Sequence, residues 1–136
     1  MSTDRELLEA AAKAAGWKGW RSKHGYWNLE SPEGKAHTCC TGWPSYSATN
    51  GEKLPEPTFG DALAEVDWNP LHNDGDALRL AVKLRIEVEP WIHGDSACSR
   101  AACGEVLIDE PHYGDDAELA TRRAIVRAAA ALAGQG

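Results

Sequence analysis

The chain has 136 residues, of which 43% are hydrophobic and 26% charged, and its formal net charge is −7. This length fits a single domain over residues 1–136 that buries its own core, and the composition excludes a disordered chain. No apolar run approaches the ~20 residues of a membrane span, and the acidic charge disfavours nonspecific binding to nucleic acids. Because the N-terminus lacks a secretory signal, a cytoplasmic location is expected.

The first predicted helix covers Asp4–Ala15. Thr3 and Glu6 form a capping-box pattern at its start, and Gly16 stands where a glycine commonly ends a helix. Apolar residues recur along the segment at helical spacing, namely Leu7, Leu8, Ala11, Ala14 and Ala15. The sequence therefore predicts a helix that buries one stripe.

The following segment, Trp17–Gly60, is rich in glycine, proline, serine and tryptophan, and we expect it to be mostly irregular. Tyr26–Leu29 is predicted as a short strand, and Ser31–Gly34 as a turn. Long irregular segments often carry function, so this region is the first place to look for binding residues.

A second helix is predicted after the turn at Pro70, with Asp74 or Asp76 as its cap. Its expected buried side consists of Ala77, Leu78, Ala81, Val82 and Leu84. Strands are predicted before and after this helix, at Glu65–Trp68, at Ile86–Ile92 (an edge strand because of Pro90) and at Glu105–Ile108.

The third predicted helix runs from Asp115 to about Ala133 and ends at Gly134. Its apolar positions are mostly alanine, which lets another element approach closely. Glu118 and Arg122 are spaced to form an ion pair across one helical turn. The order of elements predicts an α+β fold with a small, mostly antiparallel sheet and about three helices packed on one side.

The cysteines and histidines offer one metal-binding alternative. If two predicted loops meet, they bring together the zinc ligands His37, Cys39, Cys98 and Cys103. The chain has no paired Cys-x-x-Cys motif, so we expect the protein to bind no metal or cofactor. A bound zinc ion is the alternative. Catalytic and phosphate-binding motifs are absent from the sequence, which favours a binding protein over an enzyme.

Two groups of residues are candidates for binding. Trp17, Trp20 and Trp43 lie in glycine-bearing segments, where exposed indoles serve as anchors for a protein partner or stack on a base. Arg122, Arg123 and Arg127 form a local basic patch suited to a phosphate or an acidic partner. The simpler interpretations are tryptophans that are buried or half-buried and arginines on a solvated face.

Two segments resemble a known family. They are WNPLHNDGDALRLAVKL at 68–84 and, less specifically, ATRRAIVRAAA at 120–130. Together they resemble small accessory proteins of tailed bacteriophages, similar in kind to the NinX-like group, and the first predicted helix also looks like the opening of that family. The resemblance implies a phage or prophage gene expressed in the bacterial cytoplasm, and it supplies no catalytic residue.

The sequence and this resemblance predict a protein that binds a host bacterial protein and inhibits an antiviral defence system. Loop tryptophans surrounded by acidic residues are the expected contact surface. One alternative is a small-ligand binder that sequesters a nucleotide signal between the tryptophans and the arginine patch. A further alternative is a zinc-stabilised module or a metal-dependent enzyme built on the cysteines and His37.

Overall fold

A computed structural model describes residues 3–23, 26–39, 58–93, 96–112 and 116–135. The chain divides into two compact units, a small unit of Gly16–Trp68 and a large unit that combines Met1–Ala15 with Asn69–Gly136. Across the described ranges there are four helices and two three-stranded antiparallel sheets. The predicted α+β class is therefore confirmed, whereas the single domain stays a prediction.

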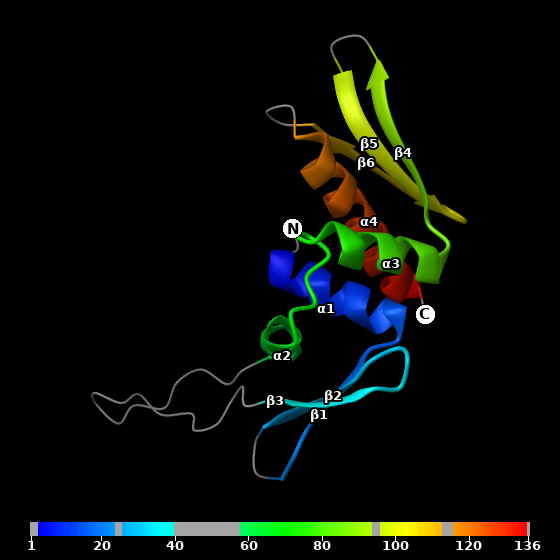
Figure 1. Cartoon of the computed structure of the whole chain (residues 1–136). Coiled ribbons are helices and arrows are strands. Elements are labelled where there is room, and N and C mark those ends of the chain that lie inside the picture. The colour runs from blue at the N-terminus through cyan, green and yellow to red at the C-terminus, as the bar shows by residue number, and fades with distance from the viewer. Residues whose placement is uncertain (1–2, 24–25, 40–57, 94–95, 113–115, 136) are drawn as a thin grey trace. The chain divides into compact units, whose positions relative to one another are not determined.

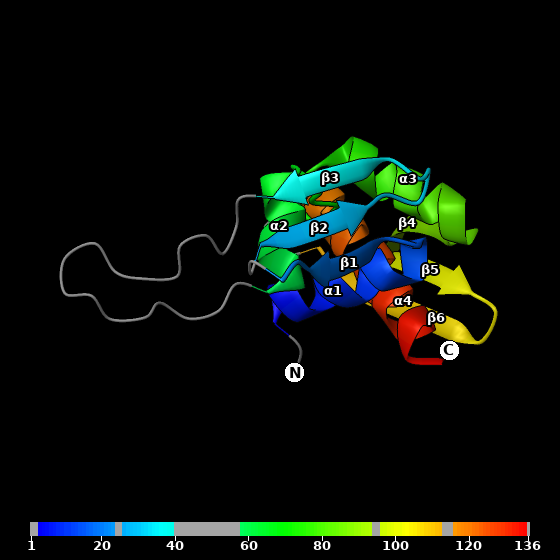
Figure 2. The same ribbon diagram turned by 90° about the horizontal axis from the view of Figure 1, so that it is seen from below.

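The small unit is a three-stranded antiparallel sheet with one helix. Its strands are β1 (Lys18–Arg21), β2 (Trp27–Glu30) and β3 (Ala36–Cys39), with β2 in the centre (Figure 2). Helix α2 (Phe59–Glu65) packs against β2, and the ring centroids of Phe59 and Trp27 are 6.0 Å apart. Leu29 and Leu63 are fully buried and form the centre of this core.

Helix α2 corrects the strand predicted at Glu65–Trp68. A capping box starts the helix, because the Asp61 amide donates to Thr58 Oγ1 (3.3 Å) and the Thr58 amide donates to Asp61 Oδ2 (2.8 Å). After Glu65, Asp67 adopts a left-handed conformation with a φ of 60° and turns the chain. The predicted strand is thus the last turn of a helix and the loop that leaves it.

Gly19 on β1 lies where the core of the small unit has no space for an added methyl group. A Cβ atom built there would lie 2.8 Å from two ring carbons of Phe59 and 3.0 Å from a methyl group of Leu29. We therefore expect Gly19→Ala to destabilise the small unit by about 1–3 kcal/mol through overpacking. Hydrogen exchange of the β2 amides measures this. The matched control is Gly134→Ala, where the new methyl group meets no atom within 4 Å; equal protection of β2 in both variants would contradict the expectation.

The large unit surrounds helix α4 (Ala117–Gln135). This helix packs against α1 (Asp4–Ala15), α3 (Asp74–Leu84) and the sheet of β4 (Glu87–His93), β5 (Ser96–Cys103) and β6 (Val106–Pro111), as Figure 1 shows. Sheet order is β4-β5-β6, so the predicted edge strand at Ile86–Ile92 is confirmed as β4. The core where α1 meets α4 is built from alanines, among them the fully buried Ala11, Ala12, Ala124, Ala128 and Ala129. These small side chains let the two helices approach closely.

Local signals placed α1 correctly and α3 nearly so. Thr3 Oγ1 accepts a hydrogen bond from the Glu6 amide at 3.2 Å, and Gly16 has a φ of +103°, which confirms both ends of α1. Helix α3 is capped by Asn73, whose Oδ1 accepts from the Asp76 amide at 2.8 Å. The predicted caps Asp74 and Asp76 are instead residues of its first turn.

The second half of the unit differs from the prediction in two elements. Strand β5 was not predicted, because SACSRAAC lacks the β-branched and aromatic residues that favour strands. It forms because β4 and β6 both pair with it. Helix α4 continues to Gln135 and does not end at Gly134, and Asp116 Oδ1 caps its start by accepting from the Leu119 amide at 2.9 Å.

Candidate functional site

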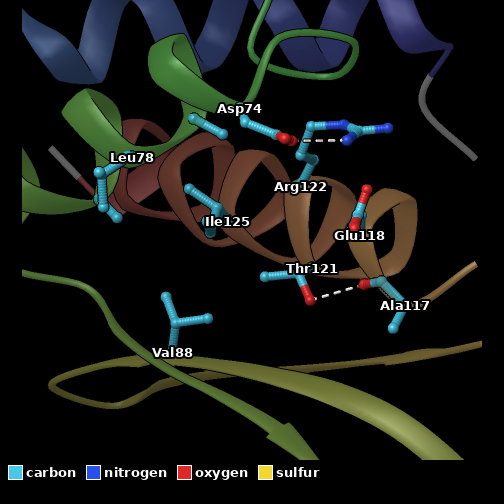
Figure 3. Close-up of a pocket in the computed structure, with 10 residues that line it drawn as sticks. Asp74, Leu78, Val88, Ala117, Glu118, Thr121, Arg122 and Ile125 are labelled. Carbon is cyan, nitrogen blue, oxygen red and sulfur yellow. Dashed lines mark hydrogen bonds and ion pairs between the residues drawn. The ribbon is translucent and has the colours of Figure 1, made fainter.

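The large unit contains a pocket of about 420 Å³ between α3, β4 and α4, named here the α3–α4 pocket. Leu78 of α3 and Val88 of β4 lie on opposite sides of it, with Ile125 of α4 between them (Figure 3). Ala77 and Ala81 also line it, and their short side chains leave the space that larger residues would fill. The lining is mostly apolar, which is typical of a binding site for an apolar group.

Two large apolar side chains of α3 are exposed to solvent. Leu78 is 64% exposed and Val82 is 70% exposed, and they lie one helical turn apart. The prediction that both are buried is wrong. The helix buries Ala77, Leu80 and Ala81 instead, which leaves Leu78 and Val82 on its outer surface, with Leu78 also lining the α3–α4 pocket.

The polar end of the pocket is organised by Arg122. Its Nε donates to the Leu71 carbonyl at 2.8 Å and its Nη1 to Asp74 Oδ1 at 2.7 Å, and the side chain is only 16% exposed. The predicted ion pair between Glu118 and Arg122 is therefore wrong. Glu118 is exposed and makes no ion pair with any residue that the structure describes.

The other two candidate arginines bind Glu110, a buried carboxylate of β6. Arg127 Nη1 donates to Glu110 Oε2, and Arg123 Nε lies 3.4 Å from Glu110 Oε1. Arg123 also donates to Asp4 Oδ1 at 3.2 Å, which connects α4 to α1. All three arginines of the predicted patch are thus engaged by carboxylates, and a phosphate would have to displace acidic groups to bind them.

The tryptophan candidates belong to the small unit. Trp17 is half-buried, with its ring centroid 6.0 Å from that of His37 and 6.1 Å from that of Trp68. Trp20 is 49% exposed. Trp43 lies outside the described residues. Of the two that are described, Trp20 alone presents a largely exposed indole, and the nucleotide site that pairs these rings with the arginines stays a prediction.

A serine and a histidine meet in the large unit at a distance typical of a nucleophile and its base. Ser99 Oγ lies 2.7 Å from His112 Nε2 and 2.7 Å from Thr121 Oγ1, and Ser99 is fully buried. Thr121 uses its only proton to bond the Ala117 carbonyl at 2.7 Å. Ser99 must then donate to Thr121, so His112 Nε2 must carry a proton and donate to Ser99. A histidine that donates to the serine is not its general base, and the cluster connects β5 and β6 to α4.

This proton assignment is directly measurable. We expect long-range ¹H–¹⁵N NMR spectra to show a protonated Nε2 on His112, with slow exchange because the serine acceptor is fully buried. The exposed His72 is the internal comparison and should exchange fast. A neutral His112 protonated on Nδ1 alone would contradict the assignment and restore the serine as a candidate nucleophile.

On the face of β5 opposite Ser99, Arg100 pairs with Asp109 of β6. Arg100 Nε donates to Asp109 Oδ1 at 2.8 Å. This hydrogen bond and the charge of Asp109 raise the pKa of the Arg100 guanidinium above its ordinary value. The pair is exposed to solvent and contributes little to stability.

The alternative zinc ligands are spread along two strands. His37 and Cys39 belong to β3 in the small unit, and Cys98 and Cys103 belong to β5 in the large unit. Cys98 and Cys103 are free thiols, and with four residues of extended strand between them they lie about 16 Å apart, so one ion does not bind both. Within the described ranges, no group of three or more His, Cys, Asp or Glu side chains is placed to hold a metal.

Sequence reasoning missed Leu78, Val82, Ser99 and His112 as residues of interest. Helical periodicity marked the two apolar residues but assigned them to the wrong face. The Ser–His contact joins β5 to the residue that follows β6, and no sequence motif marks it. Comparison with known protein families, with curated proteins and with solved structures gives no match. Among the described helices, none is long and apolar enough to cross a membrane.

Proposed function

We propose that this chain is a phage accessory protein that binds a host bacterial protein in the cytoplasm and thereby inhibits an antiviral defence system. The phage origin is supported by the resemblance of segments 68–84 and 120–130. Protein binding is supported by one structural observation, the exposure of Leu78 and Val82 beside the α3–α4 pocket. An exposed apolar surface next to a concave one is typical of a protein-interaction site.

The proposed contact surface differs from the one expected from the sequence. Loop tryptophans were the expected anchors, and Trp20 remains available for contact. The α3 surface supplies two neighbouring apolar side chains on a regular helix, whose positions are fixed by the packing of Leu80 and Ala81 against the core. Trp20 is a single exposed indole on strand β1, whereas α3 presents two exposed apolar side chains beside a pocket, which favours α3 as the main surface.

The proposal is tested by site-specific crosslinking in host cells. A photoreactive amino acid replaces Val82 in one variant and Leu107, an exposed apolar residue of β6, in a matched control. We expect the Val82 variant to capture a defined host protein that the Leu107 variant does not capture. Cells expressing the unmodified chain should also be infected more efficiently by phages that the host defence restricts. Equal capture at both positions together with unchanged infection would refute the proposal.

A further inference from the structure

Building on the proposed function, we infer that the α3–α4 pocket binds an apolar side chain of the partner that stands next to a lysine or arginine, and that Glu118 binds the cation. The supporting geometry is an apolar pocket with one carboxylate at its edge that has no ion-pair partner among the described residues.

The apolar part of the pocket sets the first requirement. Leu78, Val88 and Ile125 line the space from three elements (Figure 3). Ala77 and Ala81 also line it, and their side chains are too short to fill it. A volume of about 420 Å³ accommodates a large aliphatic or aromatic side chain with part of its backbone. Burial of such a side chain removes apolar surface of both partners from water.

The charged edge sets the second requirement. Asp74 and Arg122 bind each other at 2.7 Å, so their charges largely cancel at this edge. Glu118 is exposed, lines the pocket and has no ion-pair partner in the described parts of the chain, which leaves one net negative charge there. In Figure 3 it lies with Thr121 and Arg122 at the end of the pocket away from Leu78 and Val88.

The negative charge of the chain favours a basic occupant of the α3–α4 pocket over an acidic one. The chain carries a net charge of −7, which attracts basic partners at long range and repels nucleotides and acidic segments. The guanidinium of Arg122 does not reverse this preference, because it is mostly buried and already bound to Asp74 and the Leu71 carbonyl. A basic residue beside an apolar anchor therefore fits both parts of the pocket.

The experiment uses the full ¹⁵N-labelled chain and two dipeptide probes, acetyl-Leu-Arg-amide and acetyl-Leu-Glu-amide. We expect the basic probe to shift the amide signals of Ala81 and Ile125 and to bind about threefold to tenfold more tightly than the acidic probe. Glu118→Gln should reduce this preference, and Glu118→Lys should reverse it. The matched control is Glu105→Lys, the same charge change at an exposed site outside the pocket, which should preserve the preference.

The inference would be overturned if neither probe shifted the amide signals of Ala81 and Ile125, or if both probes bound with equal affinity. It would also be overturned if these signals shifted with protein concentration in the absence of a probe, because a second copy of the chain would then be the occupant. The outcome is distinguishable from that of the proposed function. If Val82 crosslinks to a host protein but the probes do not bind, the proposed function is supported and the proposed occupant of the pocket is refuted. If the basic probe binds but Val82 does not crosslink to a host protein, the inferred preference of the pocket is supported and the proposed function is refuted.

Discussion

Replacing Leu78 and Val82 together by aspartate is expected to abolish binding of the host protein while the fold stays intact. Buried apolar anchors at the centre of an interface contribute about 2 kcal/mol or more each, so a loss of roughly 1,000-fold in affinity is expected for the pair. The chain tolerates the change because the two side chains are 64% and 70% exposed. Affinity for the crosslinked host protein, measured by calorimetry, gives the result.

The control for this variant is Leu107→Asp, which introduces the same charge at an apolar side chain of β6 that is 56% exposed. It should bind the host protein with nearly unchanged affinity. Circular dichroism of both variants should match that of the parent chain, since exposed substitutions change stability by only about 0.5 kcal/mol. Retained binding in the α3 double variant would place the interface elsewhere, with Trp20 as the next candidate.

The second large effect is expected at Leu71. This residue is 1% exposed, and its carbonyl accepts the hydrogen bond from Arg122. Leu71→Ala should reduce the free energy of unfolding of the large unit by about 2–5 kcal/mol, because it leaves a cavity in the core. That is a large part of the roughly 5–15 kcal/mol that stabilises an ordinary domain. Urea unfolding, followed by hydrogen exchange of α4 amides, measures the loss.

Leu107→Ala is the matched control, because the same atoms are removed from an exposed position. It should change the unfolding free energy by less than about 0.5 kcal/mol. If the two variants had equal stability, Leu71 would not be a core residue, and the turn before α3 would not fix the position of Arg122.

Much of the helical structure follows from neighbouring residues in the sequence. Thr3 and Gly16 determine the ends of α1 through hydrogen bonds and backbone conformation that need no distant partner. The alanine positions of α4 were recognised as its packing face, and Ala124 and Ala128 are indeed fully buried. The α+β class followed from the order of such elements, even though helix α2 and strands β1, β3 and β5 were missed.

The candidate site depended on contacts between distant residues. Arg122 had a partner available four residues away in Glu118, yet it binds Asp74, which is 48 positions away in the chain. That choice frees the carboxylate of Glu118 at the edge of the pocket. Likewise, the buried Ser99 finds its two polar partners only in the folded chain. Strand pairing brings it to His112, and helix packing brings it to Thr121.

The sequence by itself determined both ends of α1, because the cap hydrogen bond and the glycine conformation there depend on residues within a few positions of one another. Only the tertiary structure decided that α3 turns Leu80 and Ala81 inward and leaves Leu78 and Val82 exposed. The periodicity of a helix allows more than one apolar face, and the face that is buried is the one that α4 and its neighbours cover.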